Sequence, residues 1–174
     1  PGDAGFRKRW LLHAIDLPVI GQDSFSLFVP ATTQPGHRGG QLTGQVLLPK
    51  VPLLNLIGGP GFEFFVDGTN YDNDGEVQRE MKKAGPGLPE AGSWRIELMP
   101  ASEAKADQFL VVMLPTLAGE KTPANVRRLE ENGRVGAEIS GPQRTTRWWF
   151  VPGERGLTVE IIEGESRTLH QLGG

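Results

Sequence analysis

Three side-chain oxygen donors alternate along one short polar segment: Asn70, Asp72 and Asp74. With Gly75 behind them, they have the spacing of the first half of a calcium-binding loop, where oxygen ligands alternate and a glycine allows a sharp bend. Counted from Asn70, the twelfth position should be a glutamate, but Met81 stands there and Glu80 comes one residue early. We therefore interpret the segment as a solvated turn. No cofactor is expected, and calcium is the ion that these oxygens would favour if one binds.

Aromatic and basic side chains suggest a second kind of site, for a carbohydrate. Trp148 and Trp149 are adjacent, with Arg144 and Arg147 close by. An indole face can stack on a sugar ring, and a guanidinium can hold a carboxylate or sulfate through two hydrogen bonds. Neighbouring residues of a strand point to opposite faces, so at most one tryptophan belongs to the core unless a second layer covers the other. The alternative, which we favour, is sandwich packing with one surface tryptophan shielded by arginine stems.

The histidines and the single tyrosine are the remaining candidate site residues, and of these His13 and Tyr71 are the ones that could act as a general base. His13, His37 and His170 are far apart, and none has a second ligand at the spacing of a local metal motif. His37 lies in a polar loop, where it could contact a ligand. Tyr71 lies in another polar loop and could act as a base or contact a ligand, although such a tyrosine more often packs a loop down.

Nucleophile and nucleotide motifs are missing from the sequence. Neither Gly-x-Ser-x-Gly nor a Gly-x-Gly-x-x-Gly between a strand and a helix occurs. The chain has no cysteine, which excludes disulfides, thiolate zinc sites and cysteine nucleophiles.

The elements that must position these groups are predicted to be strands. In residues 93–115, Trp94, Ile96 and Leu98 alternate with polar residues, and residues 109–114 are almost wholly apolar. This pattern predicts an antiparallel hairpin inside a larger sheet. Short apolar runs between glycine and proline turns predict further strands, and Asn132-Gly133 predicts a tight turn. We therefore predict an all-β fold, an antiparallel β-sandwich of about ten strands.

Length and composition define the expected organisation. The chain has 174 residues, with one irregular loop expected over 67–92, a frayed end at 1–5, a single sandwich domain over 6–165 and a flexible tail over 166–174. Eighteen basic and 21 acidic residues give a net charge of −3 without a basic stripe, which argues against nucleic-acid binding. No apolar run approaches the roughly 20 residues of a membrane span. Because the chain begins at Pro1 without an initiator methionine or signal pattern, we expect a piece of a longer protein.

Five segments follow one another in an informative order: RWLLHAIDLPVIG at 9–21, GGQLTGQVLLP at 39–49, IGGPGFEFFVDGTNY at 57–71, GSWRIELMP at 92–100 and DQFLVVMLP at 107–115. This succession resembles the C-terminal β-sheet region of heparinase II/III-like polysaccharide lyases, and the resemblance covers roughly residues 6–162. In that family a helical toroid precedes a large antiparallel β-sandwich, and uronic-acid polysaccharides are cleaved by β-elimination.

The resemblance implies a scaffold separated from its chemistry. The catalytic tyrosine of the family belongs to the toroid, and its His-rich and metal-binding motifs lie earlier in the sandwich. Neither has a counterpart here, and Tyr71 matches a loop of the sheet region, so no catalytic residue is carried over. The implied partners are an acidic polysaccharide or the toroid domain of the same protein, in a periplasmic or secreted location.

Three hypotheses follow. The favoured one is the C-terminal sandwich part of such a lyase, structural or supporting the substrate and not catalytic alone. The second is a self-sufficient carbohydrate-binding module that uses Trp148 or Trp149 with the nearby arginines and the loop at 67–75. The third is a small lyase or hydrolase with His13 or Tyr71 as its base.

Overall fold

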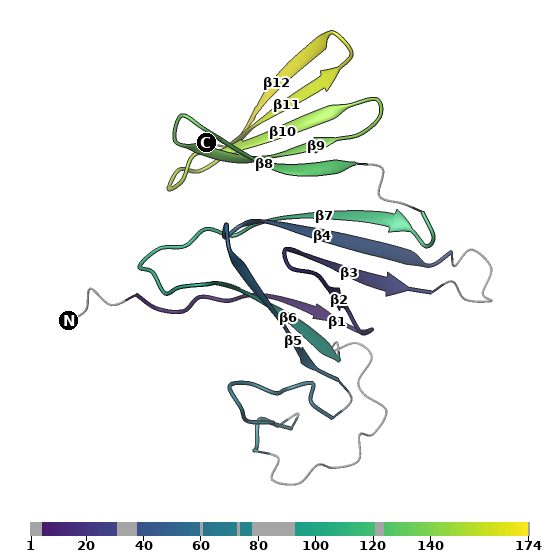
Figure 1. The fold of residues 1–174 in the computed structure, drawn as a ribbon, viewed down its shortest axis with the longest axis vertical. Helices are drawn as coiled ribbons and strands as arrows, with labels where there is room; N and C mark the ends of the chain where they lie inside the picture. Colours follow the sequence, from purple (N-terminus) through teal and green to yellow (C-terminus); the bar gives the residue numbers. More distant parts are fainter. Residues whose placement is uncertain are drawn as a thin grey trace.

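The computed structural model describes residues 5–30, 38–59, 61–72, 74–77, 93–120 and 124–173. Within these ranges the chain forms twelve strands, all paired antiparallel, and no helix (Figure 1). The predicted all-β antiparallel class is therefore confirmed. The strands form three sheets, and in Figure 1 the four-stranded sheet lies between the other two. Because the described ranges contain no helix, they offer no helical segment that could cross a membrane.

The three-stranded sheet contains the most deeply buried strand of the molecule. Its order is β1 (Trp10–Ala14), β6 (Trp94–Pro100) and β5 (Pro52–Gly58). The alternation recognised in the sequence is real, because Ile96 and Leu98 are completely buried on one face of β6. The predicted hairpin is wrong, however. Both edges of β6 are occupied by β1 and β5, and the following strand joins a different sheet.

The four-stranded sheet has the order β2 (Val19–Ile20), β3 (Ser24–Val29), β4 (Gly40–Leu48) and β7 (Leu110–Leu117). One of its faces packs on the three-stranded sheet through Phe25, which is 6.2 Å from Trp10 between ring centroids. The opposite face contributes Leu47 and Val112 to a cluster with Ala137 of the third sheet. The core therefore lies in two layers, one on each side of the four-stranded sheet.

The five-stranded sheet is a simple up-and-down arrangement of the last five strands: β8 (Asn125–Glu131), β9 (Arg134–Ser140), β10 (Thr145–Phe150), β11 (Leu157–Glu163) and β12 (Ser166–Leu172). Asn132 and Gly133 both have positive φ (49° and 76°), so the predicted tight turn joins β8 to β9. Residues 166–172, expected to belong to a flexible tail, pair with β11 along their whole length. β12 is the outer edge of this sheet.

The irregular segment that follows β5 is held on the outer face of the three-stranded sheet by hydrogen bonds and ion pairs of two arginines. Arg95 and Glu97 are both buried, and the guanidinium donates to the Glu97 carboxylate at 3.0 and 2.9 Å. Arg95 also donates to the carbonyl oxygen of Phe65 at 2.7 Å, and Arg9 pairs with Asp67 at 2.6 Å. Residues 61–72 are thereby fixed on this face. The remainder of the predicted loop, 78–92, lies outside the described residues.

Candidate functional site

A groove of about 750 Å³ lies over the five-stranded sheet, mainly on the face opposite to Ala137. Five arginines line it: Arg127, Arg128, Arg134, Arg147 and Arg167. Three glutamates line it as well: Glu130, Glu131 and Glu160. The lining therefore carries a positive net charge, although the whole chain is acidic with a net charge of −3. Trp149 supplies the large aromatic surface of the groove.

Acidic and basic side chains alternate across all five strands of this face, in a row that we call the charge ladder: Arg127, Glu138, Arg147, Glu160 and Arg167. The first four are directly opposite one another in the registers of β8 to β11. Directly opposed side chains on one face of a sheet are about 4.5–5.5 Å apart at Cβ, which is close enough for each neighbouring pair to interact. The sheet register therefore builds the ladder.

Three of the four hydrogen bonds that join Arg127 and Arg147 to the glutamates are 2.9 Å or shorter. Arg127 donates to both oxygens of Glu138, at 2.5 Å from Nε to Oε1 and 2.9 Å from Nη2 to Oε2. Arg147 lies between the two glutamates and donates to Glu138 at 2.7 Å and to Glu160 at 3.4 Å. Arg167, on the edge strand, pairs with Glu160 from the other side. Each glutamate is thus shared by two arginines.

Within the ladder the glutamates are buried, whereas the arginines of the two outer strands are exposed. Glu138 and Glu160 are buried, at 7% and 2% exposed, whereas the side chains of Arg127 and Arg167 are 61% and 68% exposed. The hydrogen bond from Arg127, assisted by Arg147, lowers the pKa of Glu138 to about 2. The hydrogen bond to Glu138 in turn raises the pKa of Arg147. At neutral pH the face therefore presents Arg127 and Arg147 held in place by the ionised carboxylate of Glu138 beneath them.

Trp149 lies one row from the ladder, on the same face. It is opposite Gly136 on β9, and its ring atom Cε3 lies 3.2 Å from where a side chain on Gly136 would begin. The guanidinium carbon of Arg134 is 4.6 Å from the ring centroid, within cation–π range. Thr158 continues the row on β11 and donates to Gln171 at 2.9 Å. Indole, guanidinium, hydroxyl and amide groups are thus available side by side.

Of the other three residues of this region that were predicted to bind a ligand, only one lines the groove. Arg147 belongs to it. Trp148 is on the opposite face, between the buried Ala137 and Val159, and its indole nitrogen is buried. Arg144 precedes β10 and lines a separate hollow of about 530 Å³, where it pairs with Glu163 at 3.9 Å. The expectation that the two tryptophans point to opposite faces is confirmed.

The predicted metal-ligating residues lie elsewhere, in the segment attached to the three-stranded sheet. Asp72 Oδ1 accepts hydrogen bonds from the backbone N–H groups of Asp74 (3.0 Å) and Glu76 (2.9 Å), which is the geometry of an Asp-capped turn. The side-chain nitrogen of Asn70 donates to the carbonyl oxygen of Gly61 at 2.7 Å. Among the residues that the structure describes, no three His, Cys, Asp or Glu side chains are placed to hold a metal ion.

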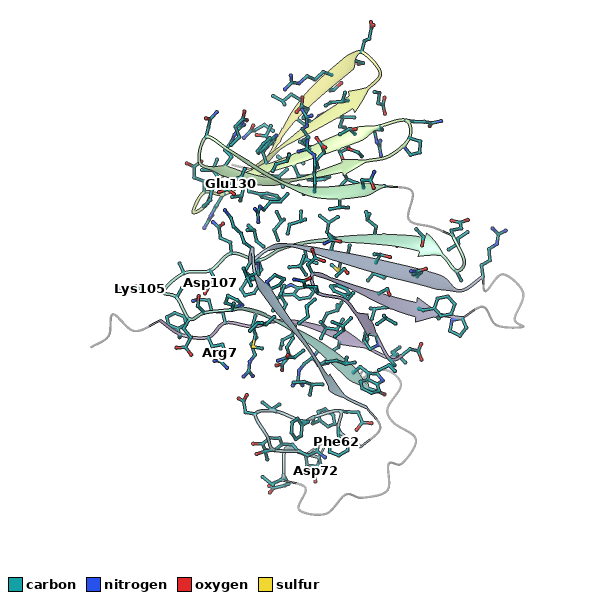
Figure 2. All side chains as sticks on the ribbon, in the orientation of Figure 1. Arg7, Phe62, Asp72, Lys105, Asp107 and Glu130 are labelled. Atoms are coloured by element: carbon teal, nitrogen blue, oxygen red, sulfur yellow. The ribbon has the colours of Figure 1, made fainter. Side chains whose placement is uncertain are left out.

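Figure 2 shows Asp72 at the far end of the molecule from Glu130, which lines the groove. Tyr71 is next to Asp72 and forms an isolated bridge with Val77, so it is not brought to Trp149 or Arg147. His13 is exposed on β1, opposite Arg95. His37, the other predicted contact residue, lies outside the described residues. The predicted residues are therefore divided between two regions.

Sequence reasoning missed Arg127, Arg134 and Arg167, and also the glutamates of the ladder. One signal in the sequence could have predicted that Arg127 pairs with Glu138. The two-residue turn at Asn132-Gly133 places Glu131 opposite Arg134, and counting outward then places Arg127 opposite Glu138. The models of known protein families and the curated proteins contain no match to this sequence.

Proposed function

We propose that this chain is the C-terminal β-sandwich part of a heparinase II/III-like polysaccharide lyase, and that it holds acidic polysaccharide along the groove of the five-stranded sheet without cleaving it. One observation carries the binding role: five arginines and Trp149 gather in one groove of a chain that is acidic as a whole. The ordered segments between residues 9 and 115 support the link to the lyases.

The chemistry of the groove supports binding more than turnover. Arginine and indole are the groups that recognise carboxylates, sulfates and the apolar faces of sugar rings. β-Elimination also needs a base that removes the proton beside the uronate carboxylate. Among the residues that the structure describes, those lining the groove include no histidine, tyrosine or lysine. Glu160, an acid in the lining, is engaged by two arginines.

The binding part is tested by calorimetric titration of the folded chain with uronic-acid oligosaccharides, with tryptophan fluorescence as a second readout. We expect Trp149→Ala to weaken binding by about tenfold, the equivalent of about 1.4 kcal/mol. Arg7→Ala is the control, because this exposed arginine lies far from the groove (Figure 2). Equal affinities of the two variants, or no binding by the unaltered chain at millimolar sugar, would refute the binding role.

The non-catalytic part is tested by the absorbance of unsaturated uronate. We expect the purified chain to leave the polysaccharide intact. Formation of the unsaturated product, and its loss in Tyr71→Phe or His13→Ala, would replace this proposal by that of a small lyase.

A self-sufficient carbohydrate-binding module is the second candidate. It is favoured by the fact that the aromatic and basic groups of the groove all come from the last five strands of this chain. The affinity of the isolated chain for an oligosaccharide distinguishes the two candidate functions. A module should bind an oligosaccharide at micromolar concentration by itself, whereas a supporting surface that shares its polymer with a catalytic domain should bind in the millimolar range.

A further inference from the structure

We infer that two copies of this chain pair edge to edge through β12, so that their five-stranded sheets join into one continuous sheet with Leu169 at the two-fold axis. The pairing does not rest on the proposed function, because it depends on the backbone of the edge strand. It assigns a second copy of the chain as the partner of this edge, and it brings Arg167 of the second copy to the groove.

β12 is the most exposed strand of the molecule. All seven of its residues are exposed, which is true of no other strand in the described ranges. Leu169 and Leu172 are 64% and 48% exposed. In Figure 1 the outer edge of β12 lies at one end of the molecule, with no other strand beside it. Its unpaired N–H and C=O groups therefore form a template on which another strand can add.

Four of the other five edge strands have features that prevent such pairing. β2 has only two residues, and β5 and β7 contain prolines, Pro52 and Pro115. β8 is held against the four-stranded sheet, where Arg128 donates to the carbonyl oxygen of Leu47 at 3.5 Å. β12 has no proline, no lysine and no register shift along its pairing with β11. Among the described edges it is therefore the longest that is open to a partner.

The turn before β12 determines which of its backbone groups point outward. Residues 164–165 form a two-residue turn, and Gly164 has a φ of 58°, as the first central position of a type II′ turn requires. Glu163 and Ser166, which flank the turn, therefore form a hydrogen-bonded pair, and the two kinds of pair then alternate along the strand. The residues of β12 whose N–H and C=O groups point away from β11 are Arg167, Leu169 and Gln171.

The contact between Thr158 and Gln171 agrees with this alternation. The two residues are directly opposite in the register of β11 and β12, and Thr158 donates to the Gln171 side chain at 2.9 Å. Side chains are closer in a non-hydrogen-bonded pair, which is the kind that the alternation assigns here. The N–H and C=O groups of Gln171 are therefore directed to the open edge.

One register pairs β12 with its copy along the whole strand. Residues 166–172 are centred on Leu169, so a full-length antiparallel pairing places Leu169 opposite Leu169 of the second copy. The same pairing places Arg167 opposite Gln171 of the second copy. All three outward-facing residues then form hydrogen-bonded pairs. Such a two-fold contact closes on itself, so it gives a dimer and leaves β12 with no free edge for a third copy.

The side chains are complementary in this register. The two exposed Leu169 side chains meet at the axis, and apolar cross-strand pairs stabilise a sheet. Arg167 is opposite an amide of the second copy, so no like charges are opposed. On the other face, Thr168 is opposite His170 of the second copy. A register shifted by four residues would instead oppose the two Arg167 side chains, which is unfavourable.

The pairing also extends the face that carries the groove. Trp149, Thr158 and Gln171 form one row across β10, β11 and β12. Directly opposed side chains lie on the same face of a sheet, so Arg167 of the second copy continues this row. The groove therefore gains a basic side chain at the edge where β12 would otherwise end it.

Analytical ultracentrifugation of the unaltered chain is the first test. We expect a monomer–dimer equilibrium with a dissociation constant of about 10 µM, as for a small interface. A chain that stays monomeric at about 100 µM, ten times that value, overturns the inference. Open-ended polymers in place of a dimer also overturn it, because the two-fold contact closes.

Two variants at the axis locate the contact, and circular dichroism shows that each is folded. Leu169→Lys opposes two ammonium groups and should weaken the dimer by about tenfold. Leu169→Pro removes an N–H group that β11 does not use, so the folded chain should be monomeric. Leu172→Lys is the matched control, because the same group then lies opposite Ser166 of the second copy, and it should change the dissociation constant by about twofold or less. Equal weakening by the two lysine variants overturns the position of the axis.

Cysteine cross-linking tests the register independently of the axis variants. The chain has no cysteine of its own. An oxidised mixture of Thr168→Cys and His170→Cys chains should form a disulfide-linked dimer, because the two positions are directly opposed. Either variant alone should link much less, because its two cysteines are diagonal neighbours about 7–8 Å apart. Equal linking of the mixture and of the single variants, or no linking at all, overturns the inferred register.

Discussion

Trp148 and Trp149 are consecutive in β10 and lie on opposite faces of the five-stranded sheet. Trp148 is opposite Ala137 and Val159, which are 2% and 5% exposed, whereas Trp149 lines the groove with Arg134 over its ring. Strand geometry alone makes neighbouring residues serve different purposes here. One indole therefore packs against buried side chains, and the other lies in the groove.

The two tryptophans should respond differently to truncation. We expect Trp148→Ala to lower the free energy of unfolding by about 3 kcal/mol, because it empties a large volume next to buried side chains. Trp149→Ala should lower it by about 1 kcal/mol or less, as for a side chain at the edge of the core. Urea unfolding measures both, and equal losses would contradict the assignment of the faces.

Acid stability should depend on Glu138. Its pKa is lowered to about 2 in the folded protein from a usual value of 4.5, chiefly by the hydrogen bond from Arg127. A lowered pKa adds stability above about pH 4.5, and this stability is lost as the pH falls from there toward 2. We expect Glu138→Gln to cost up to about 3 kcal/mol at pH 7 and much less near pH 2.

Unfolding in urea at several pH values tests this dependence. Glu154→Gln, at an exposed turn, serves as the control that changes the same functional group outside the ladder. If the unaltered protein and Glu138→Gln lose stability in parallel between pH 5 and about 2, the carboxylate does not have the predicted role.

Gly44 should be intolerant of any side chain. A Cβ at this position would lie 2.1 Å from Cζ of Phe25, a buried ring that also packs on Trp10. We expect Gly44→Ala to cost about 1–3 kcal/mol through overpacking. Gly40→Ala is a matched control in the same strand, because the nearest atom, the carbonyl oxygen of Thr116, is 3.7 Å away. Thermal unfolding should leave this control within about 0.5 kcal/mol of the original.

The buried pair of Arg95 and Glu97 should be strongly destabilised by loss of one partner. Glu97→Gln leaves the guanidinium without its carboxylate at a site that is 6% exposed, and we expect a cost of about 3–5 kcal/mol. Glu103→Gln removes an exposed partner of Arg7, at 3.9 Å, and should cost less than about 1 kcal/mol. Similar losses in the two variants would show that the pair does not anchor the segment at 61–72.

Several features followed from the sequence by itself, because they depend on near neighbours along the chain. The alternation of Ile96 and Leu98 indicated a strand with one buried face, and Asn132-Gly133 indicated the turn between β8 and β9. The opposed faces of Trp148 and Trp149 followed from strand periodicity. The turn at Asp72 followed from the ability of a short carboxylate to accept nearby backbone N–H groups.

Tertiary structure alone decided which strands became neighbours. The residues of β6 and β7 have the pattern of a hairpin, yet each strand pairs in a different sheet, because β1 and β5 occupy both edges of β6. The charge ladder has the same origin. Two-residue turns set a register locally, as for Arg127 and Glu138, but the longer connections around β10 do not, so the alignment of Arg147 with Glu160 arises only when the whole sheet is assembled.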